Sequence, residues 1–177
     1  MPTLRKGTVS GSGSSRERFA MPVKPIPDGY HSVTPYLIVK GAAAALEFYK
    51  KAFGATELMR LPGPEGKVMH AEIRIGDSII MLADEFPEMG AVSPTTLKGV
   101  ASSIMLYVPD VDAVAKNAVA AGAKEIRPVA DQFYGDRTGT FDDPFGHRWS
   151  IGTHKEDLTP QQIDERFKAW QAKQGAK

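Results

Sequence analysis

An internal repeat constrains the fold of this chain more than any other feature of its sequence. A β-rich segment, Thr34–Val39, precedes a helical pattern over residues 42–53 that stops at Gly54. A second β-rich segment, Ser103–Val108, precedes a helical pattern over 111–121 that stops at Gly122, with Asp110 as its expected N-cap. Glycine at both stops suits the left-handed conformation that commonly ends a helix. The pattern indicates two copies of one supersecondary unit.

Each predicted helix is followed by three short strands. They cover residues 57–60, 68–75 and 78–83 in the first copy and 125–129, 137–141 and 147–152 in the second. The order indicates an α+β fold with two tandem βαβββ modules, each forming a curved mixed sheet. We expect the first module over 27–84, a linker over 85–100 and the second module over 101–154.

The two ends of the chain differ in pattern. Residues 1–26 are expected to be a disordered extension, because the first twenty are rich in Ser, Gly and Arg and lack hydrophobic periodicity. Residues 155–177 contain a predicted helix, which begins with a capping box from Thr159 to Gln162. Ile163, Phe167 and Trp170 form its apolar face, which could pack on its own domain or against a second subunit.

Composition narrows the classes of partner. Lys and Arg total 22 and Asp and Glu total 21, so the net charge of +1 gives no electrostatic reason to expect nucleic acid or an anionic membrane. The absence of cysteine excludes disulfides, thiolate metal sites and cysteine nucleophiles. No apolar run is long enough to cross a bilayer, and a cytoplasmic location is the default expectation.

Four phrases of the sequence carry a family resemblance: TPYLIVKGAAAALEFYKKAFGA, HAEIRIGDSIIMLADE, DQFYGDRTGTFDDPFGHRW and THKEDLTP. Together they resemble the vicinal-oxygen-chelate superfamily of glyoxalases, bleomycin-resistance proteins and extradiol dioxygenases, and its PhnB-like branch in particular. The resemblance implies two half-barrels that form a cleft for a small-molecule ligand or substrate. It also implies a homodimer in which modules of two chains complete each cleft.

Metal-dependent members of that superfamily place four ligands, usually His and Glu, on the first and last strands of each module. The strand registers carry these positions to Thr34, Met81, Ser103 and Ser150. Hydroxyls are weak neutral donors and a thioether suits soft ions, so none of the four is a good divalent-metal ligand. We therefore predict no cofactor and no metal ligands, although a divalent metal stays possible if the register is shifted.

Strand alternation predicts which side chains reach the cleft. Along residues 69–75, His70, Glu72 and Arg74 share the face opposite the apolar residues, which makes His70 and Glu72 candidate catalytic residues. The alternative is a solvated sheet face or a local ion pair. Arg74 on this face is a candidate ligand-binding residue. The same parity gives Trp149 a place in the core and indicates further candidate ligand-binding residues, namely Tyr36, Met81, Met105, Tyr107 and Arg148.

The segment from Asp131 to Arg137 is the second candidate region. It carries three charges, two aromatic rings and an amide in seven residues, which is more than a hairpin turn requires. Its candidate ligand-binding residues are Asp131, Gln132, Tyr134 and Arg137.

Two functions follow from these patterns. One is a binder that holds a small, planar or charged molecule without catalysis. The other is a lyase, isomerase or dioxygenase, either metal-dependent or using His70 as the base with Arg74 or Arg137 to hold an anionic substrate.

Overall fold

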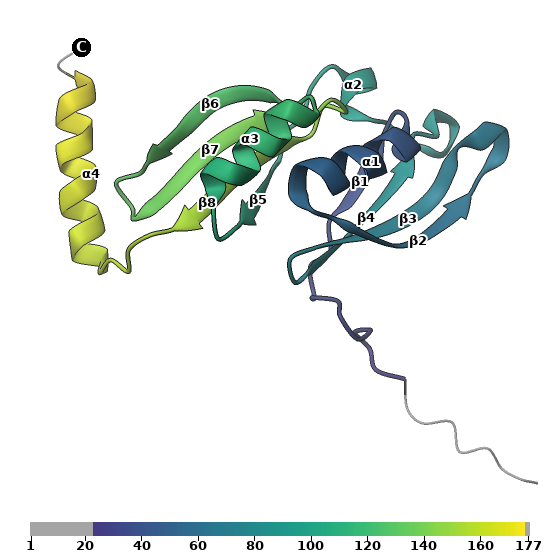
Figure 1. Ribbon diagram of the computed structural model, residues 1–177, viewed down its shortest axis with the longest axis horizontal. Helices are drawn as coiled ribbons and strands as arrows, with labels where there is room; N and C mark the ends of the chain where they lie inside the picture. The colour runs from purple at the N-terminus through teal and green to yellow at the C-terminus, as the bar shows by residue number, and fades with distance from the viewer. Residues whose placement is uncertain (1–22, 176–177) are drawn as a thin grey trace, which may run out of the picture.

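The computed structural model describes residues 23–175 and shows two similar modules side by side (Figure 1). The first sheet has the strand order β1-β4-β3-β2, in which β1 is parallel to β4 and the other neighbours are antiparallel. The first module consists of β1 (Tyr36–Val39), α1 (Ala42–Phe53), β2 (Thr56–Pro62), β3 (Val68–Ile75) and β4 (Ser78–Asp84), with a short 3-10 turn η1 (Pro64–Gly66) between β2 and β3.

The second module repeats this topology. Its sheet has the order β5-β8-β7-β6, again with one parallel pair, β5 and β8. The predicted α+β fold with two tandem βαβββ modules is therefore confirmed. The second module consists of β5 (Ser103–Tyr107), α3 (Val111–Ala121), β6 (Lys124–Asp131), β7 (Asp136–Asp142) and β8 (Arg148–His154).

Both module helices end as predicted but begin differently from each other. Gly54 and Gly122 adopt left-handed conformations, with φ of 65° and 114°. Asp110 caps α3 by accepting a hydrogen bond from the backbone N–H of Ala113. The start of α1 is instead held by Asp84, whose carboxylate accepts hydrogen bonds from the N–H groups of Gly41 and Ala42 at 2.8 and 2.9 Å. This buried carboxylate ties β4 to the helix that covers it.

The two modules share one hydrophobic core. Helices α1 and α3 contact each other, and the core cluster contains buried residues of both modules. Trp149 is 1% exposed, as predicted for a core residue, and its ring lies 4.7 Å from that of Phe53 and 5.6 Å from that of Tyr49. The modules are thus joined through the helix-covered sides of their sheets.

The segments before and between the modules contain little regular secondary structure. Residues 1–22 of the predicted disordered extension lie outside the described residues, and 23–35 contain no helix or strand. The predicted linker over 85–100 contains a 3-10 turn, η2 (Pro87–Met89), and a short helix, α2 (Pro94–Leu97). Ser93 is buried and caps α2 by accepting a hydrogen bond from Thr96 N.

The C-terminal helix α4 (Pro160–Gly175) stands apart from the two sheets (Figure 1). Its capping box forms as predicted, because Thr159 and Gln162 exchange side-chain to backbone hydrogen bonds. Phe167 and Trp170 contact Phe133, between β6 and β7, at ring distances of 5.2 and 5.7 Å. The apolar face of α4 was expected to pack on its own domain or against a second subunit. Within the chain, it packs at least on Phe133. Within residues 23–175, no helix is both long and apolar enough to span a membrane.

Candidate functional sites on the open sheet faces

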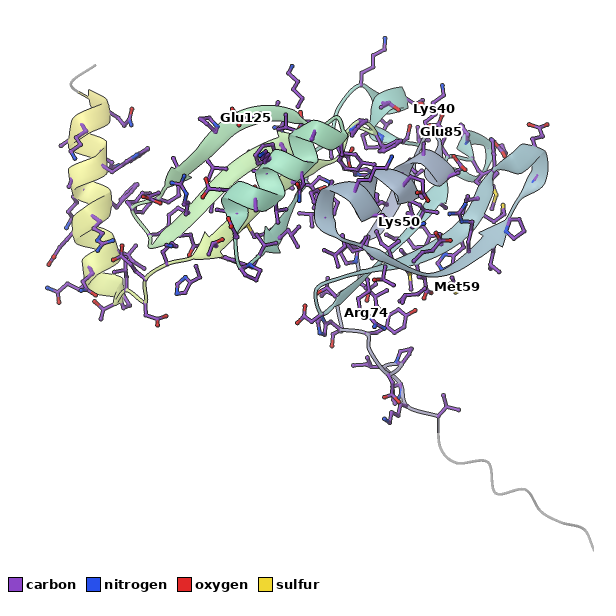
Figure 2. All side chains as sticks on the ribbon, in the orientation of Figure 1. Lys40, Lys50, Met59, Arg74, Glu85 and Glu125 are labelled. Carbon is purple, nitrogen blue, oxygen red and sulfur yellow. The ribbon has the colours of Figure 1, made fainter. Side chains whose placement is uncertain are left out.

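Each sheet has one face covered by its helix and one face that no helix of residues 23–175 covers, which we call the open face of that module (Figure 2). In the first module, Leu37, Ile73 and Leu82 point to α1 and are buried. The residues that alternate with them point to the open face. Tyr36 on β1, Met81 on β4 and Glu72 on β3 are neighbours in the strand register, so they form one row across this face.

A chain of hydrogen bonds connects four side chains on the first open face. Tyr30, from the segment before β1, donates to Glu72 Oε2. Glu72 Oε1 lies 3.1 Å from His70 Nε2, and His70 Nδ1 lies 3.0 Å from the hydroxyl of Tyr36. The pKa of Glu72 is lowered, chiefly by the hydrogen bond from Tyr30 and further by His70, while burial opposes the shift. The carboxylate is therefore ionised at neutral pH and oriented from both sides.

Arg74, which the sequence predicts on the same strand face as His70 and Glu72, does not join these hydrogen bonds. Arg74 lies on the same strand face as Glu72 but is exposed, near the point where the N-terminal segment reaches the sheet (Figure 2). Within residues 23–175 it forms no ion pair and no side-chain hydrogen bond. The structure thus brings His70, Glu72 and Tyr36 together and leaves Arg74 outside the group.

The open face of the second module carries a hollow of about 240 Å³. Its lining combines an aromatic ring and a thioether with hydroxyls, an amide and a guanidinium. Within residues 23–175, the guanidinium of Arg127 has no ion-pair partner. The lining residues are Met105, Arg127, Pro128, Gln132, Tyr134, Thr138, Gly139, Thr140 and Ser150.

A second hydrogen-bond network lies at the end of this face. The carboxylate of Asp136 is buried and accepts a hydrogen bond from the hydroxyl of Tyr107 at 2.7 Å. Its other oxygen lies 2.7 Å from His154 Nδ1, and His154 Nε2 lies 3.0 Å from Asp157. The pKa of His154 is raised, first by Asp136 and then by Asp157. The network holds the end of β8 against the start of β7.

Several predicted site residues lie elsewhere. Arg137 points to the helix side of its sheet, where it pairs with Asp112 on α3 at 2.8 Å and with Asp131 at 3.1 Å. Strand alternation explains this, because Arg137 is one residue away from Asp136, which points to the open face. Arg137 and Asp131 therefore lie away from the hollow that Gln132 and Tyr134 line, and a ligand-binding role for these two residues stays a prediction.

Arg148 contacts neither the hydrogen-bonded group on the first open face nor the hollow on the second. Its guanidinium forms two hydrogen bonds with Asp142, at 2.7 and 2.9 Å. It lines a different hollow of about 250 Å³ at the seam between the modules, which Tyr36 and His147 also line. The seam is further tied by His147 Nε2, 3.0 Å from the carbonyl oxygen of Ile38.

Several residues of the second open face are absent from the candidates that the sequence provides, among them Arg127, His154 and Asp136. Arg127 lies between two irregularities in the pairing of β6 with β7, so simple alternation cannot predict its direction. His154 follows the predicted end of its strand, but β8 continues to His154 and keeps the parity of Ser150. Asp136 could have been found from the same alternation, because it starts the strand on the face of Thr138 and Thr140.

The four positions implied for metal ligands do not form a metal site. Ser103 and Ser150 do meet, with their hydroxyls 3.1 Å apart, but neutral hydroxyls are weak ligands. Thr34 donates its hydroxyl to the carbonyl of His31, and Met81 offers only a thioether. The donor set thus does not suit Zn²⁺, Fe²⁺ or another divalent ion of that class. Within residues 23–175, no cluster of three or more His, Asp or Glu side chains could hold a metal.

Comparison with known proteins supports the fold and its family. The chain is 44% identical over 135 residues to the uncharacterized protein Rv0887c of Mycobacterium tuberculosis, a match that covers 75% of this chain and 79% of that protein. It is also similar to the solved structures of protein PA1353 from Pseudomonas aeruginosa, with 28% identity and a TM-score of 0.56, and of an Arabidopsis thaliana gene product, AT5G48480, with 27% identity and a TM-score of 0.57. These matches cover 70% and 68% of this chain and 98% and 97% of those chains.

A PhnB protein from Bacillus cereus has the same fold, with a TM-score of 0.54 at 19% identity over 70% of this chain and 99% of that chain. Residues 29–151 match the family model described as the glyoxalase/bleomycin resistance protein/dioxygenase superfamily. With two βαβββ modules and a match across both of them, the chain belongs to the glyoxalase/bleomycin resistance protein/dioxygenase superfamily.

Proposed function

We propose that this protein binds a small molecule in the hollow on the open face of the second module, without the metal ligands usual in its superfamily. The observation that carries the proposal is the guanidinium of Arg127, which lines the hollow and has no ion-pair partner within residues 23–175. An arginine without a carboxylate partner keeps its bidentate donors free for a ligand. Apolar walls with a few polar groups are the usual composition of a small-molecule site.

The lining indicates the chemistry of the ligand. Tyr134 and Met105 offer flat or polarisable apolar contact, and the hydroxyls of Thr138, Thr140 and Ser150 can donate or accept hydrogen bonds. Arg127 favours a carboxylate or a similar planar anion. The volume of about 240 Å³ suits a ligand of modest size. We therefore propose a small planar anion as the ligand class.

Binding of benzoate, measured by isothermal titration calorimetry, tests this proposal, with benzamide as the neutral analogue. We expect benzoate to bind more tightly than benzamide, and Arg127→Gln to abolish most of that difference. Arg137→Gln is the matched control, because it removes the same charge from the other face of the same sheet. Equal affinities of wild type and Arg127→Gln for benzoate would refute the proposed site.

We further propose that the chain forms a homodimer in which modules of two copies face each other across their open faces, so that each pair of faces completes a cleft that stays open to a ligand. Several large apolar side chains on these faces are exposed, among them Tyr36, Met59, Leu61, Met105 and Tyr107. Contiguous exposed apolar surface commonly marks an interface. Sedimentation equilibrium is expected to give a dimer mass, and a monomer at micromolar concentration would remove this proposal.

The alternative function is catalysis without a metal, with His70 as the base. The sequence suggested Arg74 or Arg137 as the anion anchor for such an enzyme. The structure does not favour either, since Arg137 is on the helix side of the other sheet and Arg74 lies apart from His70. What does favour an acid–base role is the arrangement of Tyr36, His70 and Glu72.

A further inference from the structure

We propose that the open face of the first module is a separate acid–base site, in which Tyr36 exchanges a proton with a bound carbonyl compound and His70 relays that proton. Tyr36 is the outermost member of the hydrogen-bond chain, 47% exposed, whereas the side chains of His70 and Glu72 are 21% and 13% exposed. The hydroxyl of Tyr36 is thus the part of the chain that a ligand on this face would meet first.

The direction of the hydrogen bonds follows from the ionised Glu72. An ionised carboxylate only accepts hydrogen bonds, so His70 Nε2 must carry the proton that points to Glu72 Oε1. In neutral His70, Nδ1 then has a free lone pair, and it accepts the hydrogen bond from the hydroxyl of Tyr36 at 3.0 Å. The imidazole is therefore held in the tautomer that can take a proton from Tyr36.

Tyr30 acts as a positioning residue behind this relay. It donates to the Glu72 oxygen that His70 does not use, so both carboxylate oxygens are held. Tyr30 comes from the segment before β1, 42 residues away from Glu72 along the chain. A base that a further hydrogen-bonded group orients is a common signature of catalytic sites.

The proton-transfer step balances without a co-reactant. A C–H bond next to the carbonyl of the ligand breaks, and its proton forms a new O–H bond on Tyr36 while the original phenolic proton moves to His70 Nδ1. The electron pair stays on the ligand and delocalises into the carbonyl as an enolate. The reverse transfer returns a proton to carbon, so the net result is exchange or isomerisation.

The surroundings of Tyr36 suit a small, partly apolar carbonyl compound. Met59 and Leu61 on β2 lie opposite Glu72 and His70 in the strand register, and both are exposed. Met81 on β4 lies beside Tyr36. These side chains give the relay an apolar border, against which the apolar part of a small ligand can pack.

Exchange of carbon-bound hydrogen in D₂O, followed by proton NMR, tests the proposal with three probes: pyruvate, hydroxyacetone and 1,3-dihydroxyacetone. We expect the wild type to accelerate exchange in at least one probe. Tyr36→Phe and His70→Gln should slow it by about 100-fold, a typical contribution of one acid–base group. His31→Gln is the matched control, because His31 is an exposed histidine of the same module outside the relay.

Tyr30→Phe separates positioning from simple structural support. Without the hydrogen bond from Tyr30, the pKa of Glu72 should rise, so the acid limb of the pH–rate profile should move to higher pH. Exchange no faster than in buffer for all three probes, or equal rates in wild type and Tyr36→Phe, would overturn the proposal. Benzoate binding by Arg127→Gln is a separate measurement, so the anion site of the second module and the acid–base site of the first can each fail without the other.

Discussion

The hydroxyl of Tyr49 on α1 of the first module donates a 2.8 Å hydrogen bond to the buried carboxylate of Asp143 in the second module. The same oxygen accepts a hydrogen bond from Trp149 Nε1 at 2.9 Å. The other oxygen accepts the backbone N–H groups of Phe145 and His147, each at 2.9 Å. One carboxylate thus shapes the turn before β8 and joins the modules, and burial together with Asp143 raises the pKa of Tyr49 well above its usual value.

Replacing this carboxylate should destabilise the whole fold. Asn at position 143 can offer only one accepting oxygen, so Asp143→Asn leaves buried donors without an acceptor, at about 1–3 kcal/mol each. We expect the free energy of unfolding, measured by urea denaturation, to fall by about 2–5 kcal/mol. Asp142→Asn is the neighbouring control, since Asp142 and its partner Arg148 are only partly buried and the loss should stay within about 1 kcal/mol. Equal effects of the two variants would contradict the linking role of Asp143.

Stability should also depend on the protonation of His154. Its folded-state pKa is raised above 6.5 by Asp136 and Asp157, so the protonated form is the one that folding favours. The contribution is therefore complete below the unfolded pKa and is lost as pH rises through the higher folded value. The melting temperature should fall between about pH 6 and about pH 9, and this fall should be larger in the wild type than in His154→Gln. A drop of the same size in both proteins would show that His154 contributes nothing to this dependence.

Glu57 should give the opposite dependence at acid pH. Arg60 and Lys50 lower the pKa of Glu57 to about 2, with Arg60 as the larger cause. The stabilisation from this carboxylate is therefore present above its unfolded pKa of about 4.5 and is lost as pH falls toward 2. Glu57→Gln should show a shallower loss of stability in this window when unfolding is followed by circular dichroism. Glu88→Gln is the control, because Glu88 is an exposed carboxylate.

The sequence predicted the fold because each module repeats local signals that tertiary packing does not override. Glycine at 54 and 122, the cap at Asp110 and strand alternation all agree with the structure. The cap of α1 was not predictable in the same way. It comes from Asp84, on a strand more than forty residues later in the sequence. Thr153, which is 69 residues after Asp84 and holds the equivalent position in the second module, supports the start of α3 in the same way.

The candidate sites were only partly predictable. Alternation placed His70, Glu72 and Tyr36 on one face, but it could not show that Tyr30 from an irregular segment would reach Glu72. Alternation also fails where pairing is irregular, which is why Arg127 was missed. The density of polar residues around Arg137 predicts a binding role, but it does not indicate to which face of the sheet the Arg137 side chain points.

The attachment of α4 gives a last test, because the chain has one buried and one exposed tryptophan. Phe133 contacts Phe167 and Trp170, and Arg166 pairs with Glu156 at 2.7 Å. Most of the stability of a helix in a protein comes from tertiary packing of one face, so Phe133→Ala should loosen the helix. We expect stronger acrylamide quenching of Trp170, measured in a Trp149→Phe background to isolate that signal, and faster proteolysis between residues 155 and 159. Unchanged quenching and proteolysis would mean that Phe133 does not anchor α4. Phe86→Ala, far along the chain in the linker, controls for general loss of an aromatic ring.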